Sequence, residues 1–132
     1  MPIDESALYV YRARILRAID GDTVEAEMDL GFSVRITKKL RLYGIDTPEM
    51  RGEEKQAGKE ARDHLIKLMY RYALNQKGGH VKDCPVLLVK THKDKEGKYG
   101  RMLAELMGLD GDEPIILNQK MVEDSFASQV ET

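Results

Sequence analysis

The feature that most constrains the fold of this chain is a series of short alternating segments, separated by turns, in its first third. Residues 9–19 carry apolar side chains on one face and arginines on the other, which is the periodicity of a β-strand. Residues 23–28 and 32–43 are predicted to continue as strands, because the turn-forming sequences D-G-D and D-L-G separate the three segments. We therefore expect a meander of three antiparallel strands.

An amphipathic helix is predicted after the meander, over residues 54–72. Its apolar side chains recur at spacings of three or four residues, so they lie on one face of a helix. This stripe consists of Ala57, Ala61, Leu65, Leu68 and Tyr72. We expect the stripe to be buried.

The second half of the chain predicts a hairpin and a further helix. Strands are expected over residues 86–92 and 99–107, with a glycine-containing turn between them. Pro114 is placed near the start of a last helix, because proline is common in the first helical turn. This order of elements is that of an OB-fold, a five-stranded barrel with a helix between strands 3 and 4. We therefore expect an α+β, mainly β protein with a C-terminal helix, in one domain over residues 1–132.

The formal net charge of the chain is −2. This balance argues against a nucleic-acid partner, since affinity for phosphate backbones comes largely from Lys and Arg. The cations are nevertheless clustered within residues 35–41 and 90–101, whereas many of the acids collect elsewhere. Such clusters are compatible with a basic stripe on the folded protein and equally with an ordinary solvated surface.

The sequence contains one cysteine, so no intramolecular disulfide is possible and nothing requires an oxidising compartment. No apolar run approaches the roughly 18 residues that a membrane span needs. The first residues include acids where a signal peptide would carry Lys or Arg. We expect a cytoplasmic protein with no membrane partner.

Two acidic residues are candidates for a metal site. Asp22 ends the turn in I-D-G-D-T-V, and Asp46 follows a strand in R-L-Y-G-I-D-T-P-E. Each residue alone is explained as well by a turn or capping role. If the fold brings them together, two carboxylates with a backbone carbonyl and waters would suit Ca²⁺, which takes all-oxygen shells with loose geometry.

Glu49 and two arginines could carry phosphodiester hydrolysis at such a site. Glu49 lies close enough to Asp46 in sequence to orient or deprotonate a water molecule. Arg41 and Arg101 have guanidinium groups that can meet phosphate oxygens with two parallel donors. The odd spacing from Arg41 to Asp46 requires a bulge or strand end near Gly44 to turn one of the side chains. For either arginine alone, a surface ion pair is the simpler explanation.

The order of these strings resembles the staphylococcal (micrococcal) nuclease, or thermonuclease, family. The resemblance extends over roughly residues 13–127 and also includes Q-A-G at the helix start and K-Y-G-R at 98–101. It implies an OB-fold and a calcium-dependent endonuclease that hydrolyses DNA and RNA, single-stranded substrates preferred. In this family the P–O5′ bond is broken, which leaves 3′-phosphate and 5′-hydroxyl ends.

The resemblance also assigns metal ligands. Asp22 and Asp46 are similar to the family's calcium carboxylates, and the carbonyl of Thr47 is similar to a further ligand. Asp20 matches an acid that lies near the ion without binding it directly.

The catalytic and substrate-binding roles follow in the same way. Glu49 is similar to the residue that holds the attacking water, and Arg41 and Arg101 are similar to the two phosphate clamps. Lys98 and Tyr99 resemble the pair that grips the terminal phosphate of a bound nucleotide.

The chain departs from the family pattern in its substrate-binding parts. The tyrosines that stack on the base would fall at and beyond Glu131, and the family's C-terminal helix would also be missing. The loop sequence M-R-G-E-E-K at 50–55 is shorter and more acidic than the lysine-rich family loop. We therefore expect the chemistry to be retained with weaker or differently directed substrate binding.

Two other functions are weighed against this one. Related domains keep the barrel, lose activity and serve as nucleic-acid or protein binding modules, but such domains lose the acids or arginines that this chain retains. An OB-fold that only binds single strands would need several aromatic platforms along a basic groove. We therefore expect a calcium-dependent nuclease that acts as a monomer, and a phage- or plasmid-encoded origin would suit a nuclease without an export signal.

Overall fold

The computed structural model describes the backbone of residues 8–78, 80–96 and 101–130. The strands are β1 (Val10–Asp20), β2 (Thr23–Asp29), β3 (Arg35–Leu42), β4 (Ile45–Asp46), β5 (Val86–Glu96), β6 (Met102–Asp110), β7 (Glu113–Ile116) and β8 (Ser128–Gln129). The helices are α1 (Lys55–Arg71), α2 (Leu117–Glu123) and a short 3₁₀ turn, η2 (Gly52–Glu54). No helix of the described part is long and apolar enough to cross a membrane.

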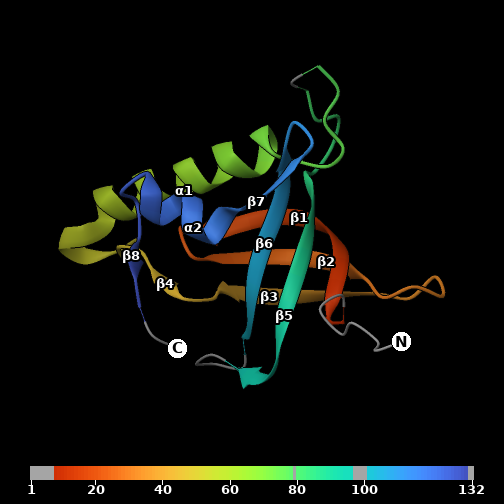
Figure 1. The fold of residues 1–132 in the computed structure, drawn as a ribbon. Helices are drawn as coiled ribbons and strands as arrows, with labels where there is room; N and C mark the ends of the chain where they lie inside the picture. The colour runs from red at the N-terminus through yellow and green to blue at the C-terminus, as the bar shows by residue number, and fades with distance from the viewer. Residues whose placement is uncertain (1–7, 79, 97–100, 131–132) are drawn as a thin grey trace.

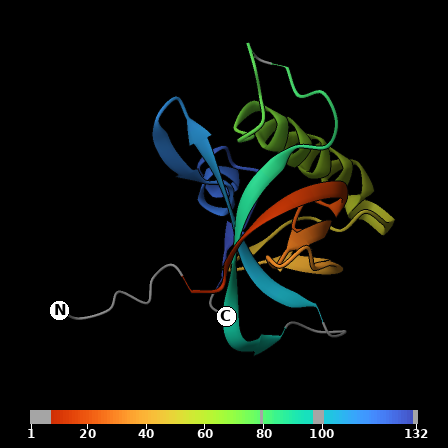
Figure 2. The same ribbon diagram turned by 90° about the vertical axis from the view of Figure 1, so that its right-hand side faces the viewer.

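The five long strands form a closed barrel. The sheet order is β3-β2-β1-β5-β6-β7, and a parallel pairing between β3 and β6 closes it. Helix α1 connects the third barrel strand with the fourth and lies across the barrel, while α2 packs on both α1 and β6 (Figures 1 and 2). The predicted α+β, mainly β OB-fold is therefore confirmed.

The core fills the space between the barrel and the two helices. The inward positions of β1 and β2 alternate along each strand, as the sequence predicts, and their side chains are buried. The largest side chains that are completely buried are Ile15, Leu40, Leu42, Leu65, Met69, Leu87, Leu106, Leu117 and Met121. With Val24 of β2 and Val89 of β5, they come from both helices and from all five long strands of the barrel.

Several of the predicted element ranges are wrong, among them the end of the strand predicted to stop at residue 107, which continues to Asp110 in β6. The third strand begins at Arg35 rather than Phe32, because Phe32 and Ser33 have positive φ angles and form a turn. Strand β5 continues to Glu96 through the predicted turn, since its pairing with β6 resumes beyond an irregularity. Pro114 lies in β7 and not in a helix. It is tolerated there because β7 is an edge strand, where a missing N–H breaks no interior ladder.

Helix α1 matches the predicted range but is rotated at its start. Ala57 is exposed, and Gly58 is the buried residue of the first turn. The reason is a close approach of backbones, because a Cβ atom built on Gly58 would lie 2.3 Å from the carbonyl oxygen of Glu49. The helix therefore packs directly on the loop that carries Glu49.

Candidate functional site

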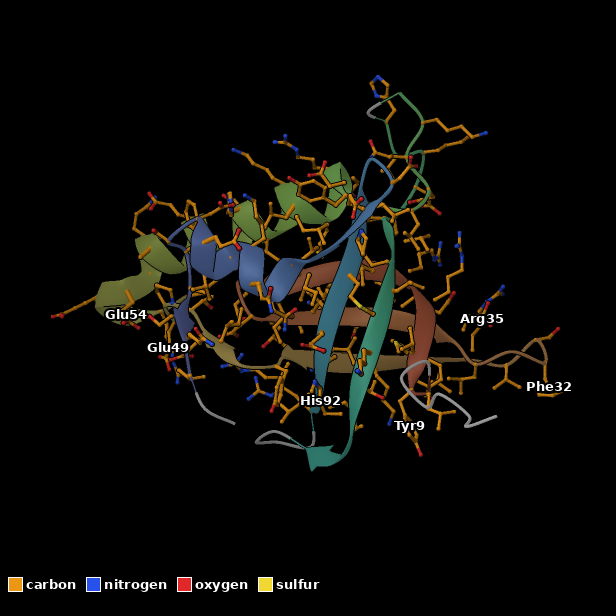
Figure 3. All side chains as sticks on the ribbon, in the orientation of Figure 1. Tyr9, Phe32, Arg35, Glu49, Glu54 and His92 are labelled. Carbon is orange, nitrogen blue, oxygen red and sulfur yellow. The ribbon has the colours of Figure 1, made fainter. Side chains whose placement is uncertain are left out.

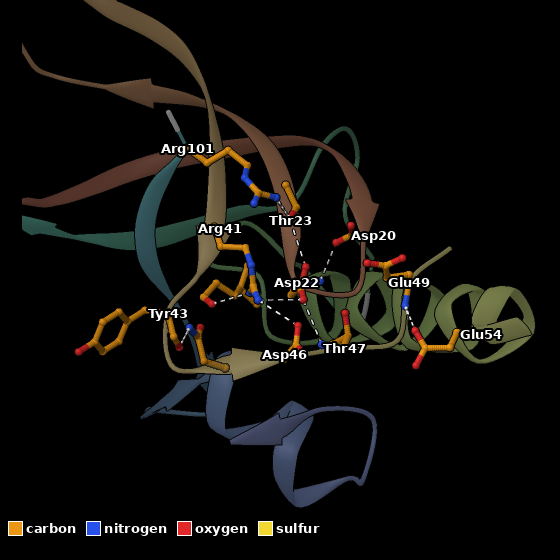
Figure 4. Close-up of polar contacts among 12 residues, drawn as sticks. Asp20, Asp22, Thr23, Arg41, Tyr43, Asp46, Thr47, Glu49, Glu54 and Arg101 are labelled. Carbon is orange, nitrogen blue, oxygen red and sulfur yellow. Dashed lines mark hydrogen bonds and ion pairs between the residues drawn. The ribbon is translucent and has the colours of Figure 1, made fainter. Parts of the chain in front are cut away.

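Barrel closure brings two distant segments of the sequence together. The parallel pairing of β3 with β6 places Arg41 opposite Leu103, two residues after Arg101. The antiparallel pairing of β2 with β3 places Thr23 opposite Arg41. The turn that carries Asp22 therefore lies beside both arginines, as the close-up in Figure 4 shows.

Arg41 lies at the centre of this cluster. Its Nη2 atom is 3.3 Å from Oδ2 of Asp22 and 3.2 Å from Oδ1 of Asp46, so both carboxylates point toward one guanidinium nitrogen. Its Nη1 donates to the carbonyl of Leu42 at 3.0 Å. Strand β3 ends at Leu42, and Gly44 has a φ of +80°, which supplies the strand end that the odd spacing required.

Asp22 is almost fully buried, at 6% exposure. Its Oδ2 accepts a hydrogen bond from the backbone N–H of Thr47 at 3.0 Å, and its Oδ1 accepts one from the hydroxyl of Thr23 at 3.2 Å. Burial raises the pKa of the Asp22 carboxyl, and the neighbouring Asp20 raises it further. Arg41 and the Thr47 N–H lower the pKa without reversing this direction. More positive charge beside Asp22 would therefore stabilise its ionised form.

Arg101 joins the cluster through a hydroxyl group. Its Nη1 donates to Oγ1 of Thr23 at 3.4 Å, and the same oxygen donates to Asp22. Thr23 is 2% exposed, so this chain of contacts is shielded from water. The hydroxyl thereby connects the second arginine with the first carboxylate.

Glu49 lies beside the cluster on an exposed loop. Its backbone N–H donates to Oε2 of Glu54 at 3.1 Å, which fixes the start of the loop against the 3₁₀ turn (Figure 4). Its carboxylate accepts from Nε of Arg51 at 3.2 Å, and both side chains are mostly exposed. Within the described residues, no contact ties this carboxylate to Asp22 or Asp46.

The oxygen donors of the cluster fit a calcium ion. Two converging carboxylates and the adjacent Thr47 backbone form a hard, all-oxygen set. The hydroxyl of Thr47 is buried and has no hydrogen-bond partner in the described structure. The described residues contain no group of three or more His, Cys, Asp or Glu side chains that could hold a metal, so waters or a substrate phosphate would have to complete the shell.

The structure thus brings Asp22, Asp46, Thr47, Arg41 and Arg101 together, and it leaves Glu49 at the margin. The predicted phosphate-binding residues Lys98 and Tyr99 lie outside the described residues.

Residues 39–132, more than half of the chain, match the family model of staphylococcal nuclease homologues. The chain belongs to the staphylococcal nuclease homologue family. The matched segment includes Arg41, Asp46, Glu49 and Arg101, whereas Asp22 reaches the site from outside it. No curated protein matches the chain.

Two contributors to this nuclease-family site were not predicted. Thr23 bridges Asp22 and Arg101, and Glu54 holds the backbone of Glu49. The one signal for Thr23 in the sequence is its position directly after Asp22. Glu54 carries no local signal, because its role depends on how the 3₁₀ turn folds back on the loop.

Proposed function

We propose that this protein is a calcium-dependent nuclease that hydrolyses phosphodiester bonds of DNA and RNA. The observation that carries the proposal is that Asp22 and Asp46 converge on Arg41 while Arg101 is linked to the same cluster through Thr23. This arrangement offers positive charge to a phosphate and oxygen ligands to a cation at one point. Membership of the nuclease homologue family supports the same reaction class.

In the proposed mechanism, Arg41 and Arg101 bind non-bridging phosphate oxygens with paired N–H donors. Glu49 orients a water molecule and takes its proton as the water oxygen attacks phosphorus. The P–O5′ bond breaks and its electron pair goes to O5′, which takes up a proton, so the products carry 3′-phosphate and 5′-hydroxyl ends. Calcium held by Asp22, Asp46 and the Thr47 carbonyl would supply positive charge that stabilises the phosphate oxygens.

In this mechanism Arg41 has to leave its two carboxylate partners, Asp22 and Asp46, in order to bind a phosphate. In the described structure its guanidinium is occupied by the two carboxylates. A cation that neutralises them would release the guanidinium toward a substrate phosphate. We propose that cation binding and substrate binding are cooperative for this reason.

The substrate and setting are proposals of the same kind. We propose single-stranded DNA and RNA as preferred substrates, contacted also by Lys98 and Tyr99, and a monomeric protein that acts in the cytoplasm. A second candidate function is that of a nucleic-acid or protein binding module with little activity. The exposed Glu49 carboxylate, which is paired with Arg51, favours this alternative.

The substitution Glu49→Gln separates the two functions. If Glu49 handles the attacking water, turnover on single-stranded DNA should fall by about 10²–10⁴-fold. Calcium affinity measured by titration calorimetry should change little, because Glu49 is not a proposed ligand. Glu53→Gln, which alters another exposed acid of the neighbouring turn, is the matched control and should retain turnover. Full turnover in Glu49→Gln would remove Glu49 from the mechanism, and wild-type binding without any hydrolysis would favour the binding module.

A further inference from the structure

The hairpin that connects β2 with β3 has an unusual tip. We call residues 29–39 the hairpin arm; they comprise the turn, which projects beyond the barrel in Figure 1, and the first part of β3. The N–H of Val34 donates to the carbonyl of Gly31 at 2.9 Å, which closes a four-residue turn. Phe32 and Ser33 occupy its two central positions with φ angles of 55° and 63°. Such turns favour Gly and Asn, and a bulky residue there is strained.

Phe32 is fully exposed, with a relative exposure of 101%. Figure 3 places it at the outer end of the hairpin arm, far from Glu49 on the opposite side of the molecule. Leu30, Val34 and Ile36 on the same arm are also more than a third exposed. A strained backbone that presents an aromatic ring to solvent points to a binding role for that ring.

The strand behind this tip leads to the candidate site along a row of polar and basic side chains. Arg35, Thr37, Lys39 and Arg41 alternate along β3 and therefore lie on one face. Lys39 is exposed and makes no ion pair within the described residues. Arg41 lies nine positions after Phe32, which corresponds to roughly 30 Å of extended chain.

The acids of the neighbouring strand offset this row only in part, because Glu25 and Glu27 also pair with arginines of β1. Glu25 pairs with Arg17 at 3.3 Å, and Glu27 is 3.8 Å from Arg14. Oδ1 of Asp29 accepts a hydrogen bond from the backbone N–H of Gly31 in the turn. The exposed rows of β1 and β3 are thus basic and the row of β2 between them is acidic, and the cations outnumber the acids.

A hollow of about 400 Å³ lies at the base of the arm and is lined by Arg12, Arg14 and Arg35, among others. Nε of Arg14 is buried there without a hydrogen-bond partner in the described structure, since Oε1 of Glu27 is 3.8 Å away. Arg35 lies 4.0 Å from the same carboxylate oxygen. Nη1 of Arg14 is held by Oδ2 of Asp83 at 2.9 Å, so Arg35, with its long contact to Glu27, is the guanidinium better suited to an anionic group such as a phosphate.

We propose that the hairpin arm binds the part of a single-stranded nucleic acid that extends beyond the cleaved bond. Phe32 stacks on a base, and Lys39 and Arg35 contact the intervening phosphates, so the strand follows β3 into the site. The inference rests on the proposed function for its direction along β3. Phe32 would then be an aromatic platform near the start of β3, whereas the candidate site lies at the other end of this strand.

The test is the binding of a fluorescently labelled 15-nucleotide single-stranded DNA, followed by anisotropy in EGTA so that no calcium is present. Phe32→Asn should weaken binding by about tenfold, because a stacked base loses its partner. Lys39→Ala should weaken binding and lower the salt slope by about one unit. Lys38→Ala is the matched control, since it removes the same charge from the opposite face of the same strand and should change binding little.

Misfolding cannot explain the expected loss, because Asn tolerates the positive φ better than Phe. The thermal unfolding temperature of Phe32→Asn should therefore equal or exceed that of the wild type. Unchanged DNA binding by Phe32→Asn would overturn the proposal. So would a wild-type dimer that this substitution converts to a monomer, or wild-type binding to anionic lipid vesicles but not to the oligonucleotide.

A short substrate separates this inference from the proposed function. A nitrophenyl phosphodiester of a single nucleotide cannot reach the hairpin arm, so its calcium-dependent hydrolysis by the wild type reports on the site alone. If the wild type does not hydrolyse it and Phe32→Asn still loses DNA binding, the nuclease proposal fails and the proposed binding role of the hairpin arm is supported. If hydrolysis occurs and DNA binding by Phe32→Asn is unchanged, the proposed binding role of the hairpin arm is wrong and the nuclease proposal is retained.

Discussion

Thr23 is the side chain that links the buried carboxylate of Asp22 to the guanidinium of Arg101. Its hydroxyl donates to one and accepts from the other, so no apolar residue of the same shape can replace it. A valine would leave a buried carboxylate oxygen without that donor and would remove the contact that joins Arg101 to Asp22.

We therefore predict that Thr23→Val lowers stability by about 1–3 kcal/mol, the cost of an unsatisfied buried group. It should also lower kcat more than it raises KM, because Arg101 is proposed to act on the transition state. Urea unfolding and steady-state kinetics measure the two effects. Thr23→Ser keeps the hydroxyl and should recover most of the activity, whereas equal losses in Ser and Val variants would contradict the bridging role.

At this scale, the sequence predicted the type and position of Asp22, Asp46, Arg41 and Arg101, and the structure brings all four together. Their short strings combine turn chemistry with charged residues, and those signals are local. The contacts of Thr23 are not local, because they depend on barrel closure that puts residue 101 beside residue 23.

Helix α1 and the loop of Glu49 behave as one unit because Gly58 lets their backbones touch. A methyl group on Gly58 would lie 2.3 Å from the carbonyl oxygen and 2.7 Å from the carbonyl carbon of Glu49. Alanine normally stabilises a helix relative to glycine by roughly 0.5–1 kcal/mol, but here the loop has to move.

Gly58→Ala should accordingly destabilise the protein by about 1–3 kcal/mol, as overpacking does, and should reduce turnover by displacing Glu49. Ala57→Gly is the control, since it alters the neighbouring exposed position and should cost only helix propensity. Denaturant unfolding and kinetics of both variants provide the comparison. A Gly58→Ala protein that is more stable than the wild type, with full activity, would show that the loop is not held by the helix.

The end of α2 is fastened to α1 by a small polar cluster. Nε2 of His64 donates to Oδ2 of Asp124 at 2.7 Å, and Nζ of Lys120 lies 3.1 Å from the other oxygen. The His64 ring also stacks on Phe126, with ring centroids 4.1 Å apart. Phe126 in turn lines a pocket that Asp46 and Glu49 share, so the cluster supports one wall of the site.

This cluster predicts a dependence of stability on pH. Partial burial raises the pKa of Asp124, but the hydrogen bonds and charges of His64 and Lys120 outweigh this effect and lower it below its ordinary value of 3.8. A lowered folded-state pKa contributes stability above pH 3.8, and the contribution is lost as the pH falls through the folded-state pKa.

Asp124→Asn should therefore lower the free energy of unfolding by roughly 0.5–1 kcal/mol at pH 7 and by much less near pH 3. Urea unfolding of both proteins at the two pH values measures this difference. Glu123→Gln, a change at the exposed neighbouring acid, should show no such pH dependence. An equal deficit of Asp124→Asn at both pH values would mean that the loss is not electrostatic.

The elements themselves were predictable where a pattern was long and regular, as in β1, β2 and α1. The errors came from positions that tertiary structure decides. Pro114 suits a helix start and an edge strand equally, and only the location of β7 at the sheet edge distinguishes them. Phe32 continues an alternating pattern, and nothing local to a phenylalanine indicates a positive φ.

For the whole molecule, closure of the barrel assembles the candidate site. The parallel pairing of β3 with β6 brings residues 40–42 beside 102–104, and without it the two arginines would belong to separate surfaces. The order of strands and helices predicted a barrel of this kind, but the sequence alone could not establish the pairing, since it joins segments about sixty residues apart. The same closure lets a protein with a net charge of −2 gather positive charge at one place.

The buried Asp22, the exposed Asp46 and the two arginines are proposed to form a single calcium-dependent site for phosphodiester cleavage. The most direct measurement is cleavage of end-labelled single-stranded DNA with calcium or with EGTA, with the product ends identified, for the wild type and for Asp46→Asn. We predict 3′-phosphate and 5′-hydroxyl products in calcium and no cleavage in EGTA. At limiting calcium, the cleavage rate of Asp46→Asn should be at least about tenfold lower than that of the wild type. Equal cleavage in EGTA, or an Asp46→Asn protein with wild-type calcium dependence, would contradict the account.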